Sequence, residues 1–265
     1  MGFGCNAAGV VGCRIIDSPR ERMVAMLTNA FVPCNGRFPA LIAIITVFFA
    51  ANALEGAALL SALVALGVVM TLLCSRLLSE TVLRGMPSFF TLELPPYRRP
   101  QPGRILLRSI YDRTLFVLAR AVIVAAPAGA LIWALNRLGL MELFSALLDA
   151  PGRLMGLNGL ILLAFILGLP ANEIVIPIIL MCVLSQNALT EYASAAELGI
   201  ILRGAGWTEK TALCFLLFTM FHSPCSTTLL TIRRESGSWR WAALAAALPT
   251  AVGAALCILV NLVWA

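Results

Sequence analysis

The stretch GLPANEIVIPIILM, residues 168–181, places a single carboxylate inside a long apolar segment. Glu173 is the only charged residue between positions 154 and 190. A charged side chain at bilayer depth is costly and normally faces a bundle interior or a water-filled cavity. Pro170 and Pro177 flank it, and each proline removes a backbone N–H donor and clashes with the carbonyl four residues earlier. We therefore expect a broken membrane helix that buries a carboxylate, a pattern typical of transporter binding sites.

The composition supports a membrane protein throughout. Hydrophobic residues make up 60% of the 265 residues and charged residues only 12%, whereas about a quarter of the residues in globular domains are charged. We predict an all-α, polytopic fold with about six or seven crossings of the bilayer, each of about 20 residues. The net charge of +6 comes from arginines between the apolar segments. These arginines indicate membrane topology, so no nucleic-acid partner is expected.

The apolar segments divide the chain into three parts of one permease domain. Residues 1–75 contain two interrupted segments and then a hairpin of residues 38–54 and 56–74, with Glu55 in its turn. Residues 76–113 form an arginine-rich loop, which the positive-inside rule places in the cytoplasm. Residues 114–265 contain a span at 114–136, a link at 137–153, the broken segment at 154–190, a polar loop at 191–210, and spans at 211–232 and 241–265.

The topology of the second half is ambiguous at one loop. Arg233, Arg234 and Arg240 indicate a cytoplasmic loop, whereas simple alternation of spans from the 76–113 loop places it outside. A re-entrant broken segment would remove the conflict.

A weak internal repeat links the two halves. Gly4-Cys5-Asn6 is followed by a Pro33-Cys34 break, and Pro170-Ala171-Asn172-Glu173 is followed by a Pro224-Cys225 break. Paired interrupted segments in two halves are typical of inverted-repeat transporters.

Several motifs occur together in one order: GFGCN at 2–6, Pro33-Cys34 with Arg37-x-Pro39, ELPPYR at 93–98, ANEIVIPIILM at 171–181 and FHSPCSTTLLTI at 221–232. With these motifs in this order, the sequence resembles the C-terminal membrane domain of the ferrous iron transport protein B family, FeoB. The resemblance covers nearly the whole chain. The resemblance implies two Gate-type halves and Fe²⁺ import across a bacterial inner membrane. It also implies that Fe²⁺ is a transported substrate, that no cofactor is permanently bound, and that the chain is not an enzyme.

Two departures from the family pattern bear on partners. The sequence has no GxxxxGK[ST] phosphate loop, so we expect GTP to be bound and hydrolysed by a GTPase on a domain or chain outside this sequence. The chain would then be a fragment, a split-gene partner or a remnant. The family pattern GCNVPA is replaced here by GCNAAG at residues 4–9, which lacks the proline.

Six side chains are candidate metal ligands. A borderline-soft ion such as Fe²⁺ accepts thiolate, imidazole, carboxylate and amide oxygen ligands. Glu173 and Asn172 would share one position, and His222 and Cys225 have the i, i+3 spacing of neighbours on one helical face, unless the intervening Pro224 breaks the helix. Cys5 and Cys34 also lie beside chain breaks. The six candidates are therefore Cys5, Cys34, Asn172, Glu173, His222 and Cys225.

Each candidate also has a structural interpretation. Glu173 could pair with an arginine, the three cysteines could be small residues at helix interfaces, and His222 could be a hydrogen-bonded interior histidine. The remaining five cysteines are expected to be packed in the core.

Three other functions remain open. The chain could be a Gate-type permease for a nucleoside or another small solute, or a membrane scaffold without transport activity. An intramembrane enzyme is a weaker alternative, because no nucleophile or HExxH spacing accompanies Glu173 and His222. The lipid bilayer is a necessary partner, and a homo-oligomer is an open alternative.

Overall fold

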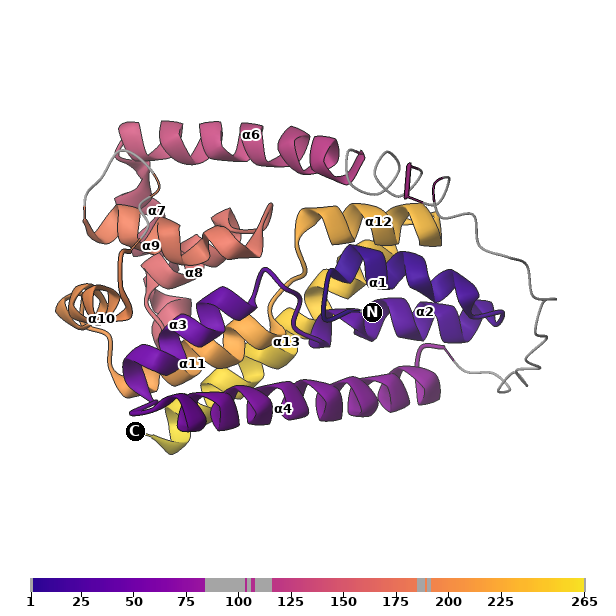
Figure 1. The fold of residues 1–265 in the computed structure, drawn as a ribbon, viewed down its shortest axis with the longest axis horizontal. Helices are drawn as coiled ribbons and strands as arrows, with labels where there is room; N and C mark the ends of the chain where they lie inside the picture. Colours follow the sequence, from indigo (N-terminus) through magenta and orange to yellow (C-terminus); the bar gives the residue numbers. More distant parts are fainter. Residues whose placement is uncertain are drawn as a thin grey trace.

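A computed structural model describes residues 2–83, 103, 106–107, 116–184, 189 and 192–264. In these residues the regular secondary structure is helical, which confirms the predicted all-α class (Figure 1). The helices are α1 (Asn6–Gly12), η1 (Cys13–Ile15), α2 (Pro19–Thr28), η2 (Asn29–Phe31), α3 (Phe38–Phe48), α4 (Ala53–Glu80), α6 (Phe116–Arg137), α7 (Leu140–Leu154), α8 (Gly159–Leu167), η4 (Asn172–Ile174), α9 (Val175–Val183), α10 (Ala195–Gly204), α11 (Glu209–Phe221), α12 (Ser226–Ser236) and α13 (Trp239–Val263).

Fewer helices are long enough to cross a bilayer than the sequence predicts. Within the described residues, α4, the α11–α12 segment and α13 have the required length and hydropathy, and α6 with α7 makes a fourth candidate that is bent by 93°. The remaining apolar segments are divided into short helices such as α8 and α9, of nine residues each. At 1.5 Å per residue, each covers about 13 Å, less than half of the hydrocarbon core.

The first helical hairpin turns earlier than the sequence predicts. Glu55 lies in the first turn of α4, and the chain reverses before it, between α3 and Asn52. The Asn52 side chain accepts a hydrogen bond from the Glu55 N–H at 3.0 Å, and the Glu55 carboxylate accepts one from the Ala51 N–H at 2.9 Å. This reciprocal capping starts the helix two residues before the glutamate.

Two predicted links are helical. The 137–153 link is mostly α7, a helix that follows α6 after a sharp bend, and the 191–210 loop contains α10. Gly139 makes the bend with a φ of +67°, a conformation that glycine adopts without steric cost. Charged residues within otherwise apolar sequence therefore did not interrupt helix formation here.

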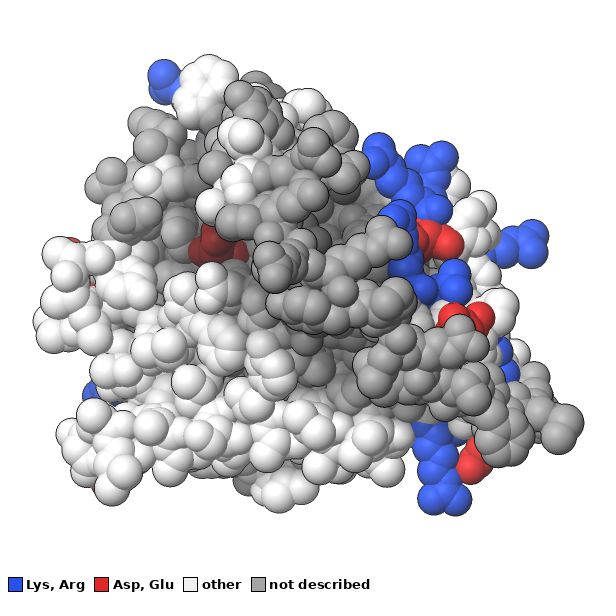
Figure 2. Space-filling view, turned by 45° about the vertical axis from the view of Figure 1, so that its right-hand side comes forward, with Lys and Arg blue, Asp and Glu red and all other residues white. Residues whose placement is uncertain are grey.

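Charged residues gather at one end of the molecule (Figure 2). At this end the Arg14 guanidinium donates to both Glu235 carboxylate oxygens, at 2.7 and 2.6 Å. Arg20 joins the same end to the last turn of α4, where it donates to the Ser79 carbonyl at 3.1 Å. Residues 13–22, the end of α4 and residues 233–240 thus lie on the same side. The arginine-rich segments of both halves are therefore gathered at one end of the molecule.

The α8–α9 pair explains how the 233–240 loop reaches that side. α8 packs against α9, and both are too short to span, so the chain enters the molecule in α8 and returns in α9. In Figure 1 this pair lies toward one end of the molecule and the α1–α2 pair toward the other. The two interrupted segments that the sequence repeat pairs thus lie toward opposite ends of the molecule.

The main apolar core lies around α3, α8, α9 and α11. Its aromatic part is formed by Phe165, which contacts Phe215 and Phe218 with ring centroids 5.2 and 4.8 Å apart. Two long helices are mostly uncovered, since only 11% of the most apolar window of α4 and 22% of that of α13 are buried, whereas 61% of that of the α11–α12 segment is buried. A buried centre with apolar, exposed outer helices is the arrangement expected in lipid.

Candidate functional site

Four breaks in the helical structure meet near the middle of the molecule. They are residues 4–6 before α1, residues 33–37 before α3, residues 169–173 between α8 and α9, and residues 222–226 between α11 and α12. We call this region the helix-break junction. Each break contains proline or glycine, whose backbone restrictions or freedom favour non-helical conformations.

Backbone hydrogen bonds connect the breaks in pairs. The Asn35 N–H donates to the Gly4 carbonyl at 3.0 Å, and the Ser226 N–H donates to the Leu169 carbonyl at 2.8 Å. In each half, the N–H that follows a Pro-Cys pair thus binds the carbonyl at the tip of the preceding interrupted segment. Freed backbone groups are satisfied at these two points, as an irregular backbone within a membrane requires.

Glu173 connects the two pairs. A Cβ atom placed on Gly36 would lie 3.9 Å from a Glu173 carboxylate oxygen and 3.9 Å from the Glu173 backbone nitrogen. The prediction that this carboxylate is buried is wrong, because the Glu173 side chain is exposed. It lies in η4, at the turn between α8 and α9, and the flanking apolar sequence does not cover it.

Arg37 is the charged side chain at the centre of the junction. It is fully buried, and its guanidinium donates to four backbone carbonyls, those of Ala30, Met220, His222 and Ser223, at 2.9, 2.9, 2.8 and 3.3 Å. These carbonyls belong to the ends of η2 and α11, where helices leave carbonyls without intrahelical donors. None of the ion pairs among the described residues involves Arg37. It therefore joins the two halves through their backbones.

The junction also collects polar atoms that have no hydrogen-bond partner. Eight buried side-chain nitrogen and oxygen atoms among the described residues lack one, and all belong to the breaks or lie within one turn of a break. They come from Asn6, Arg37, Asn172, Thr219, His222 and Ser226. Buried polar groups are normally paired, so the breaks concentrate the unsatisfied hydrogen-bonding groups of the described residues.

Three of the predicted site residues are buried at the junction. Asn172 is 6% exposed, and both its amide nitrogen and its amide oxygen lack partners. His222 is 4% exposed, with Nδ1 at 2.9 Å from the Thr219 carbonyl oxygen and Nε2 without a partner. Cys34 is also buried.

Cys5 and Cys225 are more accessible. Cys5 is exposed and is the N-cap residue of α1, whereas Cys225 is half-buried and is the N-cap residue of α12. The expected helical spacing of His222 and Cys225 is wrong. His222 ends α11 with extended dihedral angles, and Cys225 begins a separate helix after Pro224.

The predicted ligands share a region without forming a closed metal site. No group of three His, Cys, Asp or Glu side chains is arranged to hold a metal ion within the part of the chain that the structure describes. Asn6, Arg37 and Ser226 also lie at the junction but were not among the six predicted ligands. Asn6 was detectable as the counterpart of Asn172 in the internal repeat. Arg37 had one signal, its place in an interrupted apolar segment.

Two family models match the chain. The model described as "Ferrous iron transport protein B C terminus" matches residues 60–112, and the Gate model, described as "Nucleoside recognition", matches residues 118–239. Together they cover most of α4 and most of the second half.

Curated relatives match nearly the whole chain. The Fe(2+) transporter FeoB of Staphylococcus aureus strain COL is 28% identical over 94% of this chain and 37% of its own length. The Fe(2+) transporter FeoB of Methanocaldococcus jannaschii is 26% identical over 92% of this chain and 37% of its own length. The Fe(2+) transporter FeoB of Salmonella typhimurium strain LT2 is 35% identical over 44% of this chain and 15% of its own length. The chain thus spans little more than a third of the length of the first two relatives. No solved structure matches.

Proposed function

This chain belongs to the FeoB family, whose C-terminal membrane part it matches, and we propose that it forms the permeation part of a ferrous-iron importer in a bacterial inner membrane. The matched relatives are named Fe(2+) transporters, and the multi-pass helical fold suits that role. Energy would come from a GTPase on a separate domain or chain, because the sequence itself contains no phosphate loop.

The observation that carries this proposal is the set of eight unpartnered polar atoms at the helix-break junction. A buried polar atom without a partner costs about 1–3 kcal/mol, and eight of them in one region form an arrangement that is costly unless something binds there. A transported cation would be a partner for the acceptor atoms, such as the amide oxygens of Asn6 and Asn172, and water would be a partner for the N–H donors. Broken helices at the interface of inverted halves are also where transporters bind their ions.

We propose that Fe²⁺ passes between sulfur, oxygen and nitrogen ligands at the junction. Cys5 or Cys34 would receive the ion, Glu173 with Asn172 would hold it at the tip of the α8–α9 pair, and Cys225 with His222 would pass it on. Conduction requires sites that bind well enough to be entered and weakly enough to be left. A dispersed ligand set, without three metal-binding side chains together, supports transfer in steps.

The experiment is anaerobic uptake of labelled Fe²⁺ by cells that express this chain with a separate GTPase partner. We expect Glu173→Ala and Cys225→Ser each to lower uptake by at least about tenfold, because a lost ligand worth about 1.4 kcal/mol changes an equilibrium by that factor. Cys182→Ser is the matched control, since Cys182 is a half-buried cysteine on α9 outside the four breaks.

Equal membrane abundance of all variants is verified by quantitative blotting. Normal uptake by both Glu173→Ala and Cys225→Ser would remove these ligands from the mechanism. No uptake by the unsubstituted chain would favour the scaffold alternative.

One observation favours a second function. The family model that covers residues 118–239 is described as "Nucleoside recognition", and the carboxamides of Asn6 and Asn172 are suited to binding a base or a ribose. Uptake of a labelled nucleoside that is unchanged by Cys225→Ser and is not inhibited by Fe²⁺ would support this alternative.

A further inference from the structure

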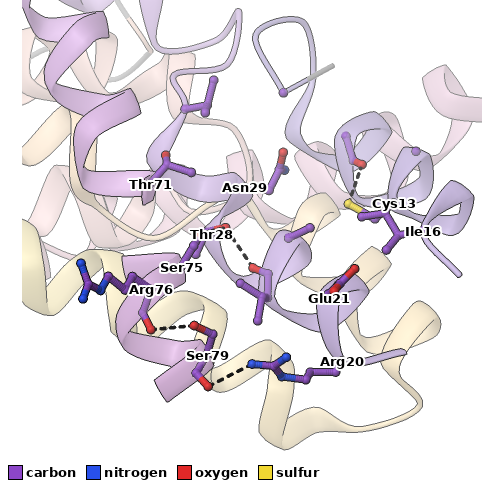
Figure 3. A pocket seen from close by; sticks show the side chains of 16 residues that line it. Cys13, Ile16, Arg20, Glu21, Thr28, Asn29, Thr71, Ser75, Arg76 and Ser79 are labelled. Atoms are coloured by element: carbon purple, nitrogen blue, oxygen red, sulfur yellow. Dashed lines mark hydrogen bonds between the residues drawn. The ribbon is translucent and has the colours of Figure 1, made fainter. Parts of the chain in front are cut away.

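A cavity of about 850 Å³ opens between α1, α2 and α4, at the end of the molecule where the charged residues gather (Figure 3). None of the six predicted site residues lines it. Its walls combine apolar surface with oxygen-bearing side chains from α2 and α4. In the centre the Ser75 hydroxyl donates to the Thr28 hydroxyl at 3.3 Å, so polar groups of the two helices meet across the space.

The lining of α4 is a polar stripe on an otherwise apolar helix. Thr71, Ser75 and Ser79 are four residues apart, which places them on one face. The neighbouring face is formed by apolar side chains such as Leu72, which is 66% exposed and suited to lipid contact. A stripe of hydroxyl groups beside lipid-facing leucines indicates that the cavity side of α4 meets water.

The inner end of the cavity reaches the helix-break junction. Gly67, one turn beyond Thr71, lets α4 touch η2, since a Cβ there would lie 2.8 Å from the Phe31 carbonyl oxygen. Asn29 lines the cavity beside this contact. Its side-chain Nδ2 donates to the Asn6 carbonyl oxygen at 2.9 Å, and the buried Asn6 carboxamide has no partner of its own. One residue therefore separates the cavity from an unpartnered polar group of the junction.

The arginines at the mouth are already engaged. Arg76 pairs with Glu80 at 2.8 Å, and its guanidinium points away from Thr28 and Ser75 in Figure 3. Arg20 donates to the Leu83 and Ser79 carbonyls at the end of α4. Glu21 adds a carboxylate to the lining. Besides the arginines and the Cys13 thiol, which donates to the Gly9 carbonyl at 3.3 Å, the polar lining includes hydroxyl and amide groups, whose oxygens are ligands for a divalent cation or its water shell.

We propose that this cavity is the cytoplasmic exit through which the hydrated divalent cation leaves the junction, with Asn29 at its inner end. The inference rests on the proposed function. Oxygen-bearing side chains outnumber the single thiol of Cys13 in this lining, and oxygen ligands suit an ion that recovers its water. The ion passes Asn6 and Asn29, follows the hydroxyl stripe of α4, and reaches the cytoplasm beside Glu21.

The test measures water access at defined positions of the full chain. Ser75→Cys and Leu72→Cys are made in a Cys13→Ala background, because Cys13 also lines the cavity. Inside-out vesicles are treated with a positively charged, membrane-impermeant methanethiosulfonate, and each site is quantified by peptide mass spectrometry. We expect Ser75→Cys to react at least about tenfold faster than Leu72→Cys, because only a hydrated thiol ionises readily to the reactive thiolate. Thr71→Cys serves as a second cavity position.

Uptake gives the second measurement. Attachment of the cationic group to Ser75→Cys is expected to abolish Fe²⁺ uptake relative to the untreated variant. Cavity positions that react no faster than Leu72→Cys, or only with lipid-soluble N-ethylmaleimide, would show a lipid-filled space and overturn the proposal. Fast labelling without loss of uptake would also overturn it. Absent uptake in the untreated, unsubstituted chain would refute the proposed function itself, and with it the exit, whatever the labelling rates.

Discussion

The two halves of the molecule share one backbone arrangement. Pro33-Cys34-Asn35 in the first half corresponds to Pro224-Cys225-Ser226 in the second, and the third residue of each donates its N–H to the tip of the preceding interrupted segment. The long helix that follows in each half packs through a glycine. Gly67 of α4 lies against the Phe31 carbonyl oxygen, and Gly253 of α13 lies against that of Phe221.

The halves differ in the side chains placed on this shared backbone. The third residue after Cys34 is Arg37, whereas the third after Cys225 is Thr228, whose hydroxyl lies 3.3 Å from the Cys225 sulfur. Arg37 binds carbonyls of both halves. The second half instead supplies the exposed carboxylate, Glu173. The two halves therefore share a backbone scaffold with two breaks each, but the side chains at those breaks differ in their chemistry.

Replacing Arg37 is expected to have the largest effect on this arrangement. Arg37→Met leaves four carbonyls without their donor, and we expect the free energy of unfolding to fall by at least about 3 kcal/mol. Arg37→Lys keeps the charge with fewer donors and should lose less. The measurement is unfolding in mixed micelles, followed by tryptophan fluorescence.

Arg203→Met is the matched control for that experiment. Arg203 also donates to a carbonyl, that of Val47 at 3.2 Å, but it is exposed. A much smaller loss is therefore expected. Equal stabilities of Arg37→Met and Arg203→Met would contradict the bridging role of Arg37.

The two glycine contacts test whether the halves are equivalent. A Cβ atom would lie 2.8 Å from the Phe31 oxygen at Gly67 and 2.9 Å from the Phe221 oxygen at Gly253. We expect Gly67→Ala and Gly253→Ala to lower the free energy of unfolding by similar amounts, about 1–3 kcal/mol each, because the backbones must separate.

Gly129→Ala in α6 is the control, since nothing lies within 4 Å of its Cβ position. It should leave stability unchanged or raise it slightly. A large loss at one of the two contact glycines, with none at the other, would mean that the halves are not packed equivalently.

Removing the hydrogen bond between the Ser226 N–H and the Leu169 carbonyl is expected to lower the free energy of unfolding by a smaller amount. Ser226 is the first residue of α12, a position where proline is tolerated, and Cys225 before it has a φ of −60° and a ψ of 157°, which a following proline accepts. Ser226→Pro therefore removes the N–H donor without breaking the helix. We expect a loss of about 1 kcal/mol in the same unfolding assay.

Ser226→Ala keeps the N–H and separates the backbone bond from the loss of the hydroxyl. Identical stabilities of Ser226→Pro and Ser226→Ala would show that the bond contributes nothing to holding the α8–α9 tip in place.

The sequence predicted the breaks better than the surroundings of their side chains. Proline and glycine act on the backbone of their own neighbourhood, so the interruptions near Cys34, Asn172 and Cys225 were visible without a fold. The burial of Glu173 was predicted wrongly for the complementary reason. Hydrophobic neighbours in sequence cover a side chain only when the chain passes straight through the core, and here it turns at the tip between α8 and α9.

The linear sequence by itself determined that this is a helical membrane protein with interrupted segments in two halves, because composition and local backbone restrictions need no partners. Tertiary structure alone decided which groups meet. The Arg37 bond to Met220 joins residues 183 positions apart, and the Arg14–Glu235 pair, which places the 233–240 loop on the arginine-rich side, joins residues 221 apart. Such contacts depend on how short helices enter and return, and no local pattern encodes that path.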